Sequence, residues 1–144
     1  MTQCLNNNRL SPDTCPPEPV RLHSNLESAL TRLSNTDLAT TPIHRVFVIG
    51  GASLYRETLG MPVSSQVGFV DRILLTRIIS PDFEHCDVYM PDFLKKTTST
   101  DGKDVIWERA THADLQAWVG SEVPEGVQME NGIEYEFQMW TRNS

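Results

Sequence analysis

One stretch decides the fold of this chain: residues 45–55, which read RVFVIGGASLY. The unbroken β-branched and aromatic run of residues 45–49 is typical of a strand buried on both faces, as in a parallel sheet. Gly50 and Gly51 end that run, and residues 52–59 predict a helix that is closed by the glycine and proline just beyond it. A strand, a glycine pair and a helix form a βα turn.

The exposed N–H groups and the positive dipole end of this helix would suit a phosphate, which makes the turn the best local candidate for a binding site. The sequence matches neither the GxGxxG nor the GK[ST] pattern of nucleotide-binding loops. A tight turn that needs glycine only for its backbone angles is an equally open interpretation.

Upstream of the turn, the sequence predicts a lead-in, a short strand and a helix. Residues 1–19 hold four prolines and no apolar periodicity, which is typical of a flexible segment. Residues 20–23 alternate as a short half-buried strand does. Ser24 and the glutamate three residues later form a capping-box pattern, so we expect a helix over about 25–34 with Ser24 as its N-cap. Residues 35–42 are expected to be a polar linker.

Downstream of the turn, the sequence predicts a mainly β tail. Strands are expected at residues 70–79 and 105–110. Residues 133–139 alternate strictly between apolar and polar, which predicts a half-buried strand near the outer region of the sheet. The intervening segments are expected to be loops or turns: residues 80–92, 95–104 and 119–132. Together these elements indicate an α/β architecture.

The composition excludes several classes of protein. The 144 residues are 39% hydrophobic and 22% charged, as in one ordinary soluble domain. The net charge of −7 without a basic stripe argues against nucleic-acid binding, and no apolar run is long enough for a membrane span. Residues 80–144 carry thirteen acidic and five basic side chains. A polyanionic ligand is therefore expected to bind away from this region.

Cysteine and histidine usage indicates neither a disulfide framework nor a metal site. The three cysteines are odd in number and widely spaced, which fits a reducing compartment. His85, Cys86 and Asp87 are three potential ligands in a row, but adjacent residues seldom converge on one ion. No metal is expected.

Residues 46–55 resemble the second signature of the dihydrofolate reductase family, in which an apolar strand leads through Gly-Gly to a helix that carries a tyrosine. Three later stretches match the family in the same order: its next strand, its acidic, aromatic and proline loop, and its final hairpin strand (residues 70–78, 86–91 and 132–140). The resemblance covers roughly residues 20–142, and the loops are most similar to those of fungal members. The family's N-terminal portion has no counterpart in this sequence.

The resemblance implies a mixed, mainly parallel sheet flanked by helices, with an antiparallel C-terminal hairpin. Residues 20–144 would form a partial dihydrofolate reductase domain, because the family's first strand, active-site loop and acidic helix are absent. The family reduces 7,8-dihydrofolate to tetrahydrofolate with NADPH, in one-carbon metabolism. We therefore expect dihydrofolate and NADPH as partners, a monomer when complete, and a cytoplasmic location, with the mitochondrion as a second one.

The chain alone is expected to be inactive, because the family's proton-donor region is absent from it. Two other functions stay open. One is a non-catalytic nucleotide-binding fragment, and the other is a related reductase of pterin or riboflavin synthesis.

The resemblance also assigns roles to individual residues. Tyr55 and Thr76 would be catalytic, with the Tyr55 hydroxyl near the nicotinamide and Thr76 bonded to the family's active-site carboxylate. Ile49 would join both in binding substrate, and Asp87 would brace a mobile loop. The Gly50–Gly51 peptide would be cis. Cofactor contacts would come from one continuous run: Ile49, Gly50, Gly51, Ala52, Ser53, Leu54 and Tyr55. Without the resemblance, Tyr55 is more simply a packing residue, Thr76 a β-former and Asp87 a turn residue.

Overall fold

The computed structural model describes residues 20–34, 43–95, 97–98, 102 and 104–143. The lead-in expected at residues 1–19 and the linker expected at 35–42 lie outside the described residues. In the part of the chain that is described, no helix is long and apolar enough to cross a membrane. The elements in chain order are α1 (Leu26–Ser34), α2 (Ala52–Leu59), β1 (Arg72–Ser80), β2 (Thr97–Thr98), β3 (Asp104–Arg109), α3 (His112–Val119), β4 (Gln128–Glu130) and β5 (Ile133–Asn143).

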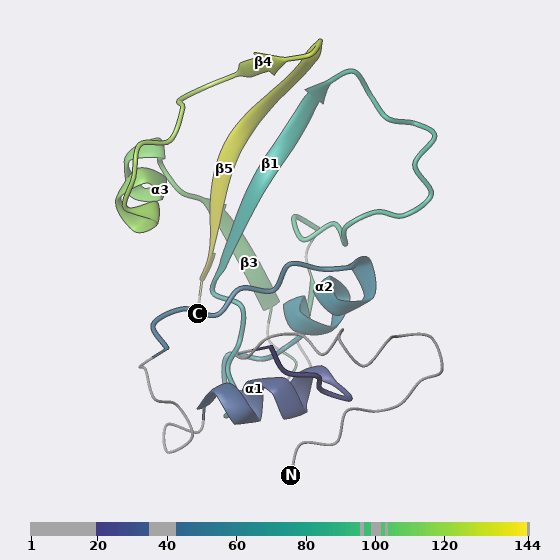
Figure 1. Cartoon of the computed structure of the whole chain (residues 1–144), viewed down its shortest axis with the longest axis vertical. Coiled ribbons are helices and arrows are strands. Elements are labelled where there is room, and N and C mark those ends of the chain that lie inside the picture. The colour runs from purple at the N-terminus through teal and green to yellow at the C-terminus, as the bar shows by residue number, and fades with distance from the viewer. Residues whose placement is uncertain (1–19, 35–42, 96, 99–101, 103, 144) are drawn as a thin grey trace, which may run out of the picture.

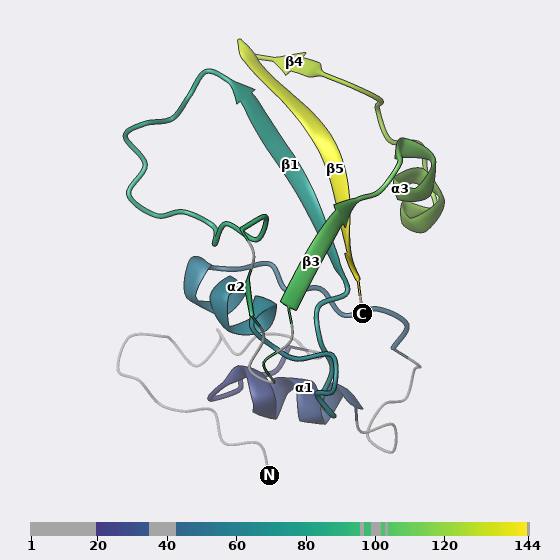
Figure 2. The same ribbon diagram turned by 180° about the vertical axis from the view of Figure 1, so that it is seen from behind.

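The strands form one sheet in the order β1-β5-β3-β2, with β4 also paired to β5. Figures 1 and 2 show β1 and β5 side by side over most of their length, α1 and α2 gathered at one end of the sheet, and α3 beside β5. All strand pairs among the described residues are antiparallel. The structure is therefore α/β with the predicted antiparallel C-terminal hairpin, but the mainly parallel sheet is not confirmed.

The position predicted for the last strand was wrong. The pattern at residues 133–139 predicted a strand near the outer region of the sheet, whereas β5 is central, with β1 on one side and β3 and β4 on the other. Side-chain alternation reports which faces of a strand are buried and says nothing about its two hydrogen-bonding edges. The sequence pattern therefore identified the strand without locating it.

The strand predicted at residues 45–49 is absent, although the residues are described. Their side chains are largely in solvent: Val46 is 50% exposed, Phe47 59% and Ile49 90%. A strand exists only when a neighbour completes its hydrogen-bond ladder, and the described residues offer none here. The short strand predicted at residues 20–23 is absent in the same way, with Leu22 84% exposed.

Two of the three helices follow the prediction closely. Helix α2 has the predicted bounds and ends at Gly60, whose N–H donates to the Arg56 carbonyl at 3.3 Å. Helix α1 forms within the predicted range, but its N-cap is Asn25 and not Ser24. The Asn25 side chain accepts a hydrogen bond from the Ser28 N–H at 2.8 Å. Asparagine caps as well as serine does, and the helix begins one residue later than the capping-box pattern implied.

Three elements were not predicted: the two-residue strand β2, which lies in the turn expected at residues 95–104, helix α3 and strand β4. Residues 119–132 were interpreted as an irregular loop, and residues 111–118 were left unassigned. Thr111 caps α3 by accepting from the Asp114 N–H at 3.1 Å, and Gly120 ends the helix in the left-handed conformation. Strands β4 and β5 form a hairpin through Asn131 and Gly132, both at positive φ. An Asn-Gly pair is the strongest short signal for such a turn.

The core is small and lies on the face of the sheet toward α2. Ile73, Val105 and Trp107 are buried, and Leu59 of α2 packs against them. Phe93 adds an edge-to-face contact with Trp107, at 5.9 Å between ring centroids. Leu115 of α3 and Met139 of β5 are also buried. No large side chain among the described residues is completely buried, so much apolar surface remains in water.

Candidate functional site

The glycine turn before α2 has an unusual backbone geometry. The Gly50–Gly51 peptide is cis, as the family resemblance implies, and Gly50 has a φ of 105°. Gly51 is the extended N-cap of α2, and its carbonyl accepts the first helical hydrogen bond, from the Tyr55 N–H at 3.0 Å. The turn thus places the Tyr55 ring against Gly50.

The two glycines meet different surroundings. A Cβ on Gly50 would lie 3.1 Å from the Tyr55 hydroxyl oxygen and 3.2 Å from Cζ of the same ring. A Cβ on Gly51 would meet nothing within 4 Å. Gly50 is therefore required by its own backbone and by Tyr55, whereas Gly51 leaves open space beside the helix N-terminus. The geometry supports both interpretations of the turn: unusual backbone angles at one glycine and free approach at the other.

The electrostatics at the start of α2 suit an anion. No side chain caps the helix, and its first turn contains no acidic residue. The first N–H groups of α2, at Ala52, Ser53 and Leu54, have no carbonyl one turn back within the helix, and together they form its positive dipole end. A phosphate group approaching past Gly51 would meet these donors without displacing a carboxylate.

The far end of α2 is anchored to the sheet. Thr58 is 2% exposed, and its hydroxyl donates to the Leu54 carbonyl at 2.9 Å. Arg142, at the end of β5, donates from Nη1 to the Met61 carbonyl at 2.8 Å, just beyond the helix. Arg142 was not predicted to be a positioning residue. No local signal could have found it, because 81 residues separate the two partners.

Among the residues assigned by resemblance, the structure brings only the turn residues together. Ile49 precedes the glycines with its side chain in solvent. Thr76 lies on β1 opposite Phe137 of β5, and its side chain is exposed. Asp87 is exposed in the loop that follows β1, which arches away from the sheet in Figures 1 and 2. Among the described residues, no hydrogen bond joins Thr76 or Asp87 to the turn.

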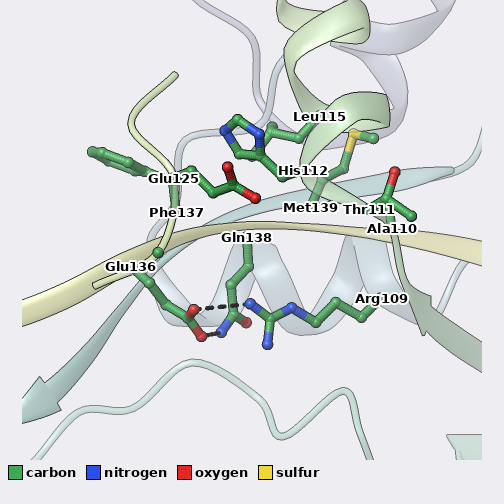
Figure 3. Close-up of a pocket in the computed structure, with 11 residues that line it drawn as sticks. Arg109, Ala110, Thr111, His112, Leu115, Glu125, Glu136, Phe137, Gln138 and Met139 are labelled. Atoms are coloured by element: carbon green, nitrogen blue, oxygen red, sulfur yellow. Dashed lines mark hydrogen bonds and ion pairs between the residues drawn. The ribbon is translucent and has the colours of Figure 1, made fainter. Parts of the chain in front are cut away.

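A pocket of about 330 Å³ lies elsewhere, between β5, the end of β3 and α3 (Figure 3). None of the residues assigned by resemblance lines it. Within the described ranges, no group of three His, Cys, Asp or Glu side chains could hold a metal ion. The turn and this pocket are therefore separate features of the molecule.

The chain is similar to curated oxidoreductases of one kind, although no family model matches it. They are dihydrofolate reductases. The chain is 41% identical to that of Pneumocystis carinii over 127 residues, which are 85% of this chain and 55% of the relative. It is 36% identical to that of Cryptococcus neoformans over 136 residues (85% and 56%) and 30% identical to that of Candida albicans over 119 (83% and 51%).

These dihydrofolate reductases are homologues of this chain, and the resemblance to fungal members is confirmed. The chain spans about half the length of the curated relatives it matches. The matches therefore fit a chain that corresponds to part of a dihydrofolate reductase.

Proposed function

We propose that this chain is part of a protein that reduces 7,8-dihydrofolate to tetrahydrofolate with NADPH. The observation that carries the proposal is the 41% identical match to a dihydrofolate reductase across 85% of the chain. The glycine turn gives that match a physical basis, because it combines an open approach at Gly51 with uncapped donors at the start of α2.

The run from Ile49 to Tyr55 would hold the cofactor. The N–H groups of Gly51 to Leu54 would bind the diphosphate, since a helix N-terminus without a capping side chain or acidic residue favours an anion. NADPH supplies the hydride when it is bound. The Tyr55 ring, packed against Gly50, would fix the edge of the site near the nicotinamide.

Two residues outside the turn complete the proposal. Thr76 stands on a face of β1 where its hydroxyl is free to bond a carboxylate from a packed helix, and with Tyr55 and Ile49 it would contact the substrate. Asp87, exposed after β1, would brace a loop over the site. We assign no proton donor within this chain, and we propose that the 144-residue chain alone does not turn over.

The finer architecture belongs to the same proposal. Residues 45–49 would become a central parallel strand once neighbouring strands complete their ladder, which accounts for an apolar run that is now exposed. Residues 20–144 would then form the partial domain and residues 1–19 a flexible lead-in. The complete protein would be a cytoplasmic monomer.

The test measures NADPH binding to the purified chain by calorimetry and NADPH oxidation by absorbance with dihydrofolate present. We expect binding without turnover. Gly51→Val should abolish binding because its side chain occupies the open approach, whereas Gly60→Ala, at the other end of α2, should leave it unchanged. Measurable turnover would overturn the inactivity of the chain. If both variants still bind NADPH, or if both lose binding, the proposed role of the turn is wrong.

Binding without turnover would also describe a non-catalytic nucleotide-binding chain, so the test needs a second arm. The rest of a fungal dihydrofolate reductase can be supplied by fusing the first part of a relative's sequence to this chain. NADPH-dependent reduction of dihydrofolate by the fusion supports the proposal. A folded fusion that binds NADPH but reduces nothing would support the non-catalytic alternative.

A further inference from the structure

The pocket beside β5 is built from three parts of the chain that converge where the sheet opens (Figure 3). Its apolar floor is formed by Leu115 of α3 and Met139 of β5, which are 5% and 3% exposed. Its rim is polar and includes His112, Glu125 and Glu136. A volume of about 330 Å³ accommodates a ligand the size of a few residues of extended peptide.

The pocket lies at a gap, where one edge of β5 is paired with neither β3 nor β4. On this edge, β5 pairs with β4 at residues 133–135 and with β3 from Trp140 onward. The Met139 carbonyl accepts from the Ala110 N–H on the same edge, while the Arg142 N–H bonds to Asp71 on the opposite edge. Because the backbone groups of a strand alternate between its edges, those of Phe137 point into the gap. The described residues supply no strand to pair with them there.

The wall of the gap is fixed by a histidine. His112 Nε2 lies 2.8 Å from the Val123 carbonyl, and since a carbonyl only accepts, Nε2 carries the donated proton. This bond ties the segment after α3 to the first turn of the helix. Glu125, two residues later, is thereby held at the rim, and Figure 3 shows its carboxylate directed toward the space between α3 and β5.

The side chains that line the pocket include two carboxylates, Glu125 and Glu136, and one guanidinium, Arg109. Residues 104–136 contain eight acidic side chains and a single basic one, Arg109. Arg109 is already paired with Glu136, at 2.9 Å between Nη2 and Oε2. Glu125 is left as the carboxylate at the rim that could receive an incoming cation. The pocket therefore combines one free backbone donor and acceptor, an apolar floor and an unneutralised negative charge.

We propose that this pocket binds an extended peptide segment that carries lysine or arginine. One residue of the segment pairs through its own N–H and C=O with Phe137, as a strand added to the free part of the β5 edge. The cationic side chain reaches Glu125, and aliphatic parts cover the floor formed by Leu115 and Met139. The acidic surroundings raise the local concentration of such a segment and exclude acidic ones.

The experiment titrates the ¹⁵N-labelled full chain with the peptide acetyl-Thr-Lys-Thr-amide and follows amide resonances. We expect a saturable shift of the Phe137 amide resonance. The same peptide methylated at the backbone nitrogen of its lysine should not produce this shift, because it cannot donate the strand hydrogen bond. Glu125→Gln should weaken binding about threefold, within the range of a partly exposed ion pair, and raised salt should weaken binding of the parent. Glu122→Gln is the matched control, since Glu122 is exposed and does not line the pocket.

Two outcomes would overturn the proposal. One is a Phe137 amide that does not move at saturating peptide while the spectrum shows the chain folded. The other is equal weakening by Glu125→Gln and Glu122→Gln, which would mean general attraction to an acidic surface. Because the test uses neither NADPH nor dihydrofolate, its failure would leave the proposed reductase function untouched.

Discussion

At the scale of single residues, Gly50 is held by two separate constraints. Its φ of 105° is strained for any residue with a Cβ, and that Cβ would lie 3.1 Å from the Tyr55 hydroxyl oxygen. We expect Gly50→Ala to lower the free energy of unfolding by about 1–3 kcal/mol. Gly51→Ala should change it by less than about 0.5 kcal/mol, because the new methyl meets open space. Urea unfolding of both variants checks this, and equal losses would contradict it.

Glu136 gives the chain a stability that depends on acid pH. A hydrogen bond from the Gln138 side-chain amide, and then the charges of Arg109 and Arg77, lower the pKa of the Glu136 carboxyl below its usual 4.5, while burial opposes this shift. A carboxyl whose pKa is lower in the folded state stabilises that state above its unfolded pKa and loses this contribution as pH falls through the folded pKa. We expect Glu136→Gln to be less stable than the parent at pH 7.

The difference between the Glu136→Gln variant and the parent should shrink as the pH is taken below 4.5. Urea unfolding at a series of pH values measures it. Glu130→Gln is the control, since Glu130 is exposed at the end of β4 and, among the described residues, its side chain makes no hydrogen bond or ion pair. A Glu136→Gln deficit that stays constant from pH 7 to pH 3 would show that the side chain acts through shape and not through its charge.

At the scale of elements, the stability of α3 depends on the hydrogen bonds between its N-cap, Thr111, and Asp114 in its first turn. The Thr111 hydroxyl accepts from the Asp114 N–H at 3.1 Å and donates to the Asp114 carboxylate at 2.6 Å. We expect Thr111→Ala to cost about 1 kcal/mol of stability, and Thr111→Ser, which keeps the hydroxyl, to cost a few tenths. Thermal unfolding and hydrogen exchange of the Asp114 amide measure both. An alanine variant as stable as the serine variant would contradict the capping role.

Every element that the sequence predicted correctly has a local signal. Helix α2 and strands β1, β3 and β5 carry their own periodicity, and Gly60 marks the end of the helix. Helix α3 and the β4–β5 hairpin, which were not predicted, also carry local signals, in the Thr111–Asp114 pair and the Asn131–Gly132 turn. The segment at 45–49 is different, because a strand depends on a neighbour that its own sequence does not describe.

In the candidate site, too, local features could be predicted from the sequence and long-range contacts could not. The turn could be predicted because Gly50, Gly51 and Tyr55 lie within six residues, and the structure places the tyrosine ring against Gly50. The anchor of α2 could not, because Arg142 reaches the Met61 carbonyl from the other end of the chain. The free edge at Phe137 was equally hidden, since it results from where β3 and β4 stop pairing with β5. Sequence patterns give faces and turns, whereas edges and long-range contacts need the fold.

At the scale of the whole molecule, one edge of the described sheet is a strand with exposed apolar side chains. β1 is nine residues long and lies at the edge of the sheet, with Leu74 and Ile78 each 44% exposed. The apolar segment at 45–49 is unpaired in the same molecule. A long edge strand with exposed apolar side chains is a template for pairing with another chain. The physical consequence is association through β1.

We therefore expect the chain to self-associate as its concentration rises, and Ile78→Lys to weaken this association about tenfold, or about 1.4 kcal/mol. A lysine on an edge strand opposes stacking of a second strand, and Ile78 is exposed enough to accept it without unfolding. Sedimentation velocity over a concentration series measures the effect. Leu22→Lys is the matched control, because Leu22 is 84% exposed and lies outside β1. If both lysines weaken association equally, general apolar exposure drives it and the β1 edge does not.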